Sequence, residues 1–415
     1  MAIPALAALA ADPLLSLVDA GFVARLGTPA LAALGINGAV FGFAFVMFNF
    51  LAYATTPMVA QAMGRGEPDQ ARLTIARAIW LALLLGGIAA ALLNFLARPI
   101  VLVLQAGPEV VEPAVAYLRI RALAAPAVLV VTAAHGAFRG LHDTRTPLMV
   151  AVVTNLVHAG LDPLLIYGFD WGVEGAAAAS LLAQTGAAIW FWRLISGRIG
   201  AIRLGKVSRI DLSPFLRSGG LLTLRTVMLV LTATLGTAAA AAIGTSRVAA
   251  HQVVRETWFL SAMLIDGVAI AAQALVAEQV GKRDEAMAHT VSRRLVVWGG
   301  WTGLAVTLAW LLGGPSLGSL FASSPEVETL IVSATKVAAV FAVPSAILWV
   351  LDGIFLARLQ LRTMALSTGA GLVAGAVVFW ITLRWGWDLA GIWWGMGAMV
   401  MARLAVLTLR PDRDR

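Results

Sequence analysis

The sequence predicts an all-α polytopic membrane protein with twelve transmembrane helices in two six-helix lobes. The composition, the number of apolar segments and an internal repeat together predict this fold class. Of the 415 residues, 60% are hydrophobic and only 13% are charged, whereas soluble domains contain about 45–50% apolar and about 25% charged residues. This composition argues against a soluble enzyme, a disordered chain and a secreted disulfide scaffold, and the chain has no cysteine.

Twelve apolar segments approach the length of about 20 residues that a helix needs to cross a bilayer. The first continues through Asp12 and Asp19 and has no basic residue before it, which indicates a transmembrane helix rather than a cleaved signal peptide. Because it begins abruptly, we expect a few residues to precede it. The twelve segments centre near residues 12, 47, 85, 127, 157, 182, 230, 263, 303, 343, 373 and 397.

The basic residues are distributed unevenly between the two sides of the membrane. Loops after even-numbered spans, with the C-terminal tail, hold 20 of the 30 Lys and Arg residues, and the odd-numbered loops with their helix ends hold eight. Since short cytoplasmic loops are enriched in Lys and Arg, this pattern predicts that both termini are cytoplasmic. Membrane topology thus accounts for the net charge of +8, and we expect no nucleic-acid partner.

The chain repeats itself at a shift of 217 residues. Pro108-Glu109-Val110 aligns with Pro325-Glu326-Val327, and four further segments keep the same register. Each repeat holds six spans, an even number, so both halves enter the membrane from the same side. This geometry predicts a pseudo-two-fold axis along the membrane normal, as in transporters built from parallel repeats. We expect an N-terminal lobe at residues 1–200, a cytoplasmic linker at 201–213 and a C-terminal lobe at 214–415.

Carboxylates inside the predicted spans are informative, because each costs at least about 2.5–3.5 kcal/mol at the bilayer centre. In the first span, Asp12 and Asp19 are seven residues apart and share one helix face. In the fifth span, Asn155, His158 and Asp162 also share a face. The predicted topology places Asp19 and Asp162 at similar depth, about 10 Å below the outer surface.

Two carboxylates in one poorly solvated cavity titrate as a coupled pair. Asp19 and Asp162 would then load a proton or hold a hard monovalent cation such as Na+. His158, one turn from Asp162, would join a proton relay or serve only in packing. The alternative for the acids is a buried hydrogen-bond network without transport function.

The second lobe carries its own candidates, on spans expected to face the cleft between the lobes. Asp266 and Asp352 would bind a cationic substrate or a proton, and the alternative is ion pairing with an intramembrane arginine such as Arg225. Methionine side chains would make the surrounding apolar cavity pliable. The predicted substrate cavity comprises Asp266, Asp352, Trp258, Met263 and Gln252.

Five segments in chain order carry a specific family resemblance. They are LVDAGFVARLG (17–27), FRGLHDTRTPL (138–148), NLVHAGLDPLLIYG (155–168), GVEGAAAAS (172–180) and AAHQVVRETWFLSAMLIDGVAIAAQALV (249–276). The chain resembles the multidrug and toxic compound extrusion (MATE) transporters, in their DinF-like branch. This resemblance implies export of organic cations or other toxic compounds, driven by inward movement of H+ or Na+.

The resemblance also implies a first-lobe cation site, which falls by position on Asp12, Asp19, Tyr117, His158, Asp162 and Ser180. The chain departs from its relatives in carrying Asp12 for Gln or Glu, His158 for Asn, and Ser180 for the commoner Thr. An additional carboxylate and a titratable ring favour protons over sodium. Asn155, on the same face as His158, completes the predicted site.

The sequence therefore predicts a secondary antiporter in a bacterial cytoplasmic (inner) membrane. We expect a monomer that exports cationic or amphipathic small molecules and needs no cofactor beyond its coupling ion, H+ or Na+, at Asp19 and Asp162. A lipid-linked saccharide flippase is the alternative, but it would need a cationic cavity for pyrophosphate. A membrane-embedded enzyme is not expected, since no H-E-x-x-H metal motif is present. A channel is disfavoured because no segment resembles a selectivity filter.

Overall fold

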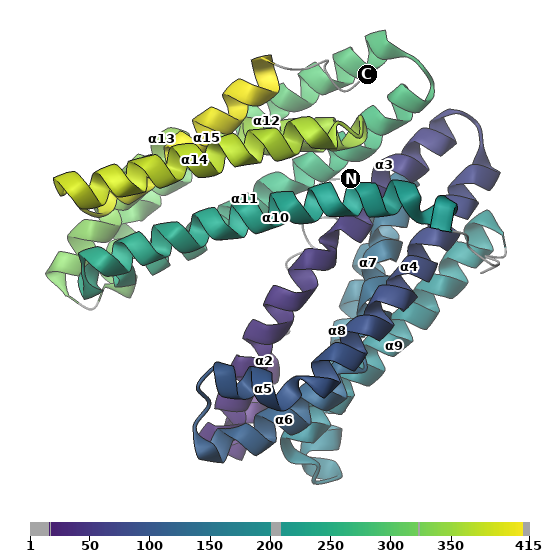
Figure 1. Ribbon diagram of the computed structural model, residues 1–415, viewed down its shortest axis with the longest axis horizontal. Coiled ribbons are helices and arrows are strands. Elements are labelled where there is room, and N and C mark those ends of the chain that lie inside the picture. Colours follow the sequence, from purple (N-terminus) through teal and green to yellow (C-terminus); the bar gives the residue numbers. More distant parts are fainter. Residues whose placement is uncertain (1–15, 17, 201–208, 323, 410–415) are drawn as a thin grey trace. The chain divides into compact units, whose positions relative to one another are not determined.

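Helices joined by short turns make up nearly all of the chain that the structure, a computed structural model, describes (Figure 1). The described residues fall into two units that are divided between Gly219 and Gly220, and α10 crosses this boundary. The structure describes residues 16, 18–200, 209–322 and 324–409.

Eleven of the twelve predicted spans lie in described parts of the chain. Nine helices there are long and apolar enough to cross a membrane, and a bent pair of helices adds a tenth span. The span expected near residue 182 is a single helix of 28 residues, Gly172–Ile199, about 42 Å long at 1.5 Å per residue. It is rich in alanine and is not among the nine helices that are long and apolar enough by this measure. The predicted first span, with Asp12, lies almost wholly outside the described residues.

The helices of the first unit are interrupted repeatedly. A 3₁₀ turn joins α2 to α3, and α6 and α7 meet at a bend of 50°. Pro126, in the first turn of α7, has no N–H to donate to the preceding turn. The elements are η1 (Ala24–Leu26), α2 (Thr28–Val46), η2 (Met47–Asn49), α3 (Phe50–Gly64), α4 (Pro68–Phe95), α5 (Ala97–Val103), α6 (Pro108–Ala122), α7 (Ala125–Gly140), α8 (Arg145–Pro163), the π-helix η3 (Leu164–Gly168) and α9 (Gly172–Ile199).

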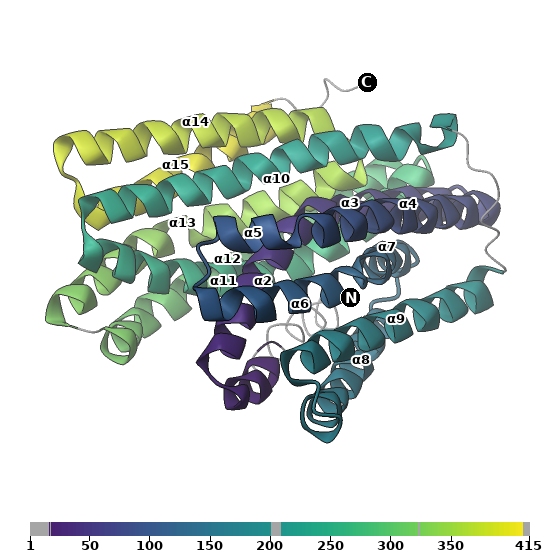
Figure 2. The same cartoon turned by 60° about the horizontal axis from the view of Figure 1, so that its bottom comes forward.

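The second unit is built from longer, uninterrupted helices. In Figures 1 and 2, α10 and α14 each run unbroken from end to end. Its helix α13 covers in one piece the stretch that the first unit divides between α6 and α7. The elements are α10 (Arg209–Ile243), α11 (Thr245–Gly281), α12 (Glu285–Phe321), α13 (Pro325–Ala357), α14 (Leu361–Trp385) and α15 (Asp388–Leu409).

The internal repeat is also present in the packing of each unit. The starts of α2, α4 and α6 lie 217 residues before those of α11, α12 and α13. In α7, a Cβ added at Gly136 would lie 2.8 Å from the carbonyl oxygen of Ala52 in α3. In α13, a Cβ added at Gly353 would lie 2.4 Å from the carbonyl oxygen of Ala269 in α11. The same shift relates these two close contacts, so the two units share one pattern of helix packing.

Substituting Gly353 by alanine is expected to destabilise the second unit by about 1–3 kcal/mol, the usual cost of overpacking. The added methyl group meets backbone atoms of Ala269, which cannot rotate away as a side chain can. The melting temperature in detergent measures this loss. Gly300→Ala in α12 is the matched control, because an added Cβ there meets nothing within 4 Å. Equal melting temperatures for the two variants would contradict the prediction.

The turn between α7 and α8 is held by Asp143. Its carboxylate accepts hydrogen bonds at 3.0 Å from the backbone N–H groups of Arg145 and Thr146, and one at 2.7 Å from the Thr146 hydroxyl. Arg198, near the end of α9, forms an ion pair with the same carboxylate. Partial burial opposes ionisation, but these hydrogen bonds and the Arg198 charge hold the pKa of Asp143 below its usual range. Asp143 therefore ties the start of α8 to α9.

Candidate functional site

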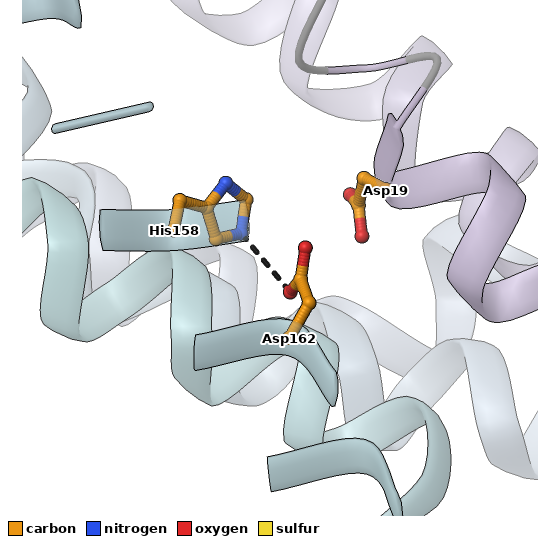
Figure 3. A group of neighbouring side chains, drawn as sticks. All are labelled: Asp19, His158 and Asp162. Carbon is orange, nitrogen blue, oxygen red and sulfur yellow. Dashed lines mark ion pairs between the residues drawn. The ribbon is translucent and has the colours of Figure 1, made fainter. Parts of the chain in front are cut away.

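Asp19, His158 and Asp162 form a buried cluster in the first unit. Asp19 lies in the helical turns before η1, whereas His158 and Asp162 lie one turn apart on α8. One ligand atom from each of the three side chains lies within 4.8 Å of the other two. Figure 3 shows the imidazole ring and the two carboxylates turned toward one another. Their exposed fractions are only 7%, 5% and 0%, respectively.

The local backbone explains how Asp162 is presented to the cluster. Pro163 follows it directly and ends the regular α-helix, and the chain continues as the π-helix η3. Single π-turns of this kind are frequent at functional sites. Within η3, the Tyr167 hydroxyl donates a hydrogen bond of 2.6 Å to the carbonyl oxygen of Phe22. This bond joins the end of α8 to the segment that carries Asp19, so it helps to set the separation of the two carboxylates.

A hydrogen-bonded chain leads from the cluster into α9 and α6. The Nε2 atom of His158 lies 3.0 Å from the Ser180 hydroxyl and 3.4 Å from Oδ1 of Asp162. The Tyr117 side chain on α6 is hydrogen-bonded to Ser180 in turn. Both Tyr117 and Ser180 are 2% exposed. Five residues of the predicted site therefore lie together: Asp19, Tyr117, His158, Asp162 and Ser180.

Three of the four carboxylate oxygens of the cluster lack hydrogen-bond partners among the described residues. Within the part of the chain that the structure describes, neither oxygen of Asp162 nor Oδ1 of Asp19 makes a hydrogen bond, although all three atoms are buried. Buried polar atoms in proteins are nearly always satisfied, and each exception requires an explanation. A proton, a cation or ordered water on these oxygens would supply one.

A cavity of about 220 Å³ adjoins the cluster, and Asp19, His158 and Ser180 lie in its wall. Arg121 of α6 lines the same cavity, and its guanidinium carbon lies 5.1 Å from the centre of the Phe41 ring. Arg121 was not among the predicted site residues and was counted only as a basic residue near a helix end. A usable signal existed, because Arg121 follows Tyr117 by four residues and so shares its helix face.

Two further residues were predicted for the site. Asp12 lies outside the described residues. Asn155 lies on α8 one turn before His158 and is half-buried, and it is not among the residues that line the cavity.

In the second unit, Asp352 is held between two arginines. Its carboxylate accepts hydrogen bonds of 2.7 Å from Arg225 on α10, and of 2.9 and 2.7 Å from Arg403 on α15. Asp352 and Arg403 are 4% and 1% exposed. This arrangement corresponds to the ion-pair interpretation of Asp352, with Arg403 as a partner that the sequence analysis did not name.

The other residues of the predicted substrate cavity lie on α11. Trp258 packs against Trp349 and Trp393, with ring centres 5.6 and 6.4 Å apart. Asp266 and Met263 are half-buried. Gln252 is exposed and donates a hydrogen bond of 2.9 Å to Glu256.

Two repeated units of membrane-spanning helices, both with buried ionisable groups, define a membrane transport protein. A protein-family model described as MatE matches residues 4–164 and 222–381, two segments that begin 218 and end 217 residues apart. The chain belongs to the MATE family, whose members are multidrug efflux transporters rather than enzymes.

The sequence G-P-S-L-G at 314–318 has the spacing of a hydrolase nucleophile elbow, but it lies inside helix α12 rather than at a turn between a strand and a helix.

Relatives in plants and bacteria match nearly the whole chain. Protein DETOXIFICATION 44, chloroplastic, of Arabidopsis thaliana is 34% identical over 97% of this chain and 80% of its own length. DNA damage-inducible protein F of Escherichia coli (strain K12) is 28% identical over 90% of this chain and 82% of its own. A crystal structure of MATE in the bent conformation covers 100% of this chain and 94% of its own, with a TM-score of 0.92 and 22% identity. The last similarity concerns the fold alone.

Proposed function

We propose that the protein is a secondary antiporter that exports organic cations, drugs or toxic metabolites in exchange for H+ or Na+. The observation that carries this proposal is the buried pair Asp19 and Asp162, whose ligand atoms lie within 4.8 Å. Oδ1 of Asp19 and both oxygens of Asp162 lack hydrogen-bond partners among the described residues. Two buried carboxylates at this separation favour the uptake of one cation, because its charge relieves their mutual repulsion.

In the proposed cycle, Asp19 and Asp162 are hydrated when the protein opens outward, and they take up the coupling cation. Neutralising the pair lets the first helix repack, which weakens the grip on the exported substrate and releases it. Opening inward then discharges the cation to the cytoplasm. The Tyr167–Phe22 hydrogen bond supports this coupling, since it links the first helix to the end of α8.

We further propose that the coupling ion is H+ and that both termini are cytoplasmic. The titratable ring of His158 beside Asp162 supports H+, because imidazole is a poor ligand for Na+ and a good proton acceptor. The excess of basic residues in the even-numbered loops supports the orientation. A bacterial inner membrane, a monomeric state and cationic or amphipathic substrates complete the proposal.

Inverted membrane vesicles test the proposal directly. In such vesicles the lumen corresponds to the cell exterior, so an acidic lumen is expected to drive uphill accumulation of a fluorescent organic cation. A Na+ gradient of the same size at uniform pH is expected to drive none. Accumulation under the Na+ gradient alone would replace H+ by Na+ as coupling ion. Failure of both gradients to drive accumulation would contradict antiport of organic cations.

A further inference from the structure

We propose that Asp19, His158 and Asp162 form a binding site for a divalent transition-metal ion, with Zn2+ as the ion that fits the ligand set best. The metal would occupy the site described above, so its effect on transport rests on the proposed function, whereas its binding does not. The proposal adds a ligand of different charge and chemistry to H+ and Na+.

The residue types of the cluster favour a transition-metal ion over a hard cation. Carboxylates alone suit hard cations such as Na+, Mg2+ and Ca2+, but an imidazole nitrogen is a ligand for Zn2+, Cu2+, Fe2+ and Ni2+. One imidazole and two carboxylates supply three protein ligands from two helical segments. Catalytic zinc sites also take three protein ligands, and they leave the fourth position to water. The cavity of about 220 Å³ beside the cluster has room for that water.

The separations of the ligand atoms are close to those of a zinc site. Zn–N and Zn–O bonds of about 2.0–2.2 Å place tetrahedral ligand atoms about 3.4 Å apart, and here one atom of each side chain lies within 4.8 Å of the others. Closing the site therefore requires shifts of about 1 Å. The two carboxylates can make these shifts, because neither oxygen of Asp162 nor Oδ1 of Asp19 is held by a hydrogen bond among the described residues.

The hydrogen bonds around His158 resemble those that orient metal-binding histidines. The ring is hydrogen-bonded to the backbone of Ala176 as well as lying 3.0 Å from the Ser180 hydroxyl. Hydrogen bonds to a backbone carbonyl orient metal-binding histidines and raise their affinity. If Nε2 of His158 coordinates the metal, the Ser180 hydroxyl remains next to the site and can form a hydrogen bond with the metal-bound water. Arg121 in the cavity wall opposes any cation, so binding of moderate strength is expected.

We expect the metal ion and the coupling cation to compete for the site. A metal ion and the coupling cation cannot occupy the two carboxylates together, so Zn2+ supplied on the outer side is expected to inhibit transport. Raising the concentration of the coupling cation is expected to relieve this inhibition. Transport would then respond to external transition metals through the coupling site itself.

Zn2+ binding to the purified full chain in detergent tests the proposal, measured by calorimetry, with Co2+ absorption as a report on the ligand geometry. One Zn2+ per chain is expected, and His158→Asn is expected to weaken this binding by at least about tenfold. His251→Asn is the matched control. It removes a histidine of the second unit that is 2% exposed and whose Nε2 lies 3.3 Å from the Thr237 hydroxyl, and it is expected to leave Zn2+ binding unchanged.

The proposal is overturned if the wild-type chain binds no Zn2+, or if His158→Asn and His251→Asn bind it equally to wild type. Melting temperatures of the variants show whether both are folded, and Asp162→Asn provides a second ligand variant that must also lose binding. Failure of the metal site and failure of the proposed function are distinguishable. A chain that binds no Zn2+ but loses efflux in Asp162→Asn lacks only the metal site. A chain that binds Zn2+ but keeps full efflux in Asp162→Asn lacks only the coupling role.

Discussion

Asp162→Asn is expected to reduce gradient-driven efflux to the level of vesicles without the protein, while the chain still folds and reaches the membrane. Asparagine has almost the same shape as aspartate, and both oxygens of Asp162 lack hydrogen-bond partners within the described residues, so little packing or bonding is lost. It cannot take up and release a proton, however, so the coupling step disappears. Accumulation of a fluorescent cation in inverted vesicles with an acidic lumen measures the loss.

Asp170→Asn is the matched control for this experiment. Asp170 lies in the turn after η3 in the same unit, is exposed, and has a φ of 58°, a conformation that asparagine tolerates well. This variant is expected to transport as the wild type does. Asp19→Asn is expected to behave like Asp162→Asn, because both carboxylates belong to the pair. Wild-type efflux in both variants of the pair would refute the coupling mechanism.

Asp352→Asn is expected to destabilise the second unit by about 3–5 kcal/mol, the cost of removing one partner from a buried ion pair. Two guanidinium groups share the Asp352 carboxylate, and Arg403 is only 1% exposed. Without the carboxylate, a positive charge would remain in the interior with no counter-charge from Asp352. The effect is measured as the loss of melting temperature of the purified protein in detergent, together with its yield from membranes.

Glu285→Gln controls for the removal of an acidic residue as such. Glu285 pairs with Arg358 at 2.9 Å, and its side chain is 49% exposed, where ion pairs contribute about 0–1 kcal/mol. The expected shift in melting temperature is therefore small. If the melting temperature of Asp352→Asn is the same as that of Glu285→Gln, Asp352 is not a structural ion-pair residue. Its role in binding substrate would then need to be examined instead.

Much of the architecture follows from the sequence because its causes are local. A helix that crosses a bilayer must be apolar over about 20 residues, so eleven of the spans could be located from composition, and all eleven correspond to helices. The repeat was visible because equivalent helix starts keep their residue types, as at Pro108-Glu109-Val110 in α6 and Pro325-Glu326-Val327 in α13. The high energy of a carboxylate in lipid likewise singled out Asp19, Asp162 and Asp352.

The partners of these carboxylates were decided by the tertiary structure. Helix periodicity gives the face on which a side chain lies, but not the rotation of one helix against another. Asp19 approaches Asp162 where the Tyr167 hydroxyl of the π-turn is hydrogen-bonded to the carbonyl oxygen of Phe22, a contact that helix periodicity does not predict. Arg121 reaches the cavity, and Arg403 reaches Asp352, only through the packing of helices far apart in the chain. The sequence by itself singled out Asp19, Asp162 and Asp352 as buried carboxylates, because each lies in an apolar segment, whereas only long-range packing decided which charged groups meet them.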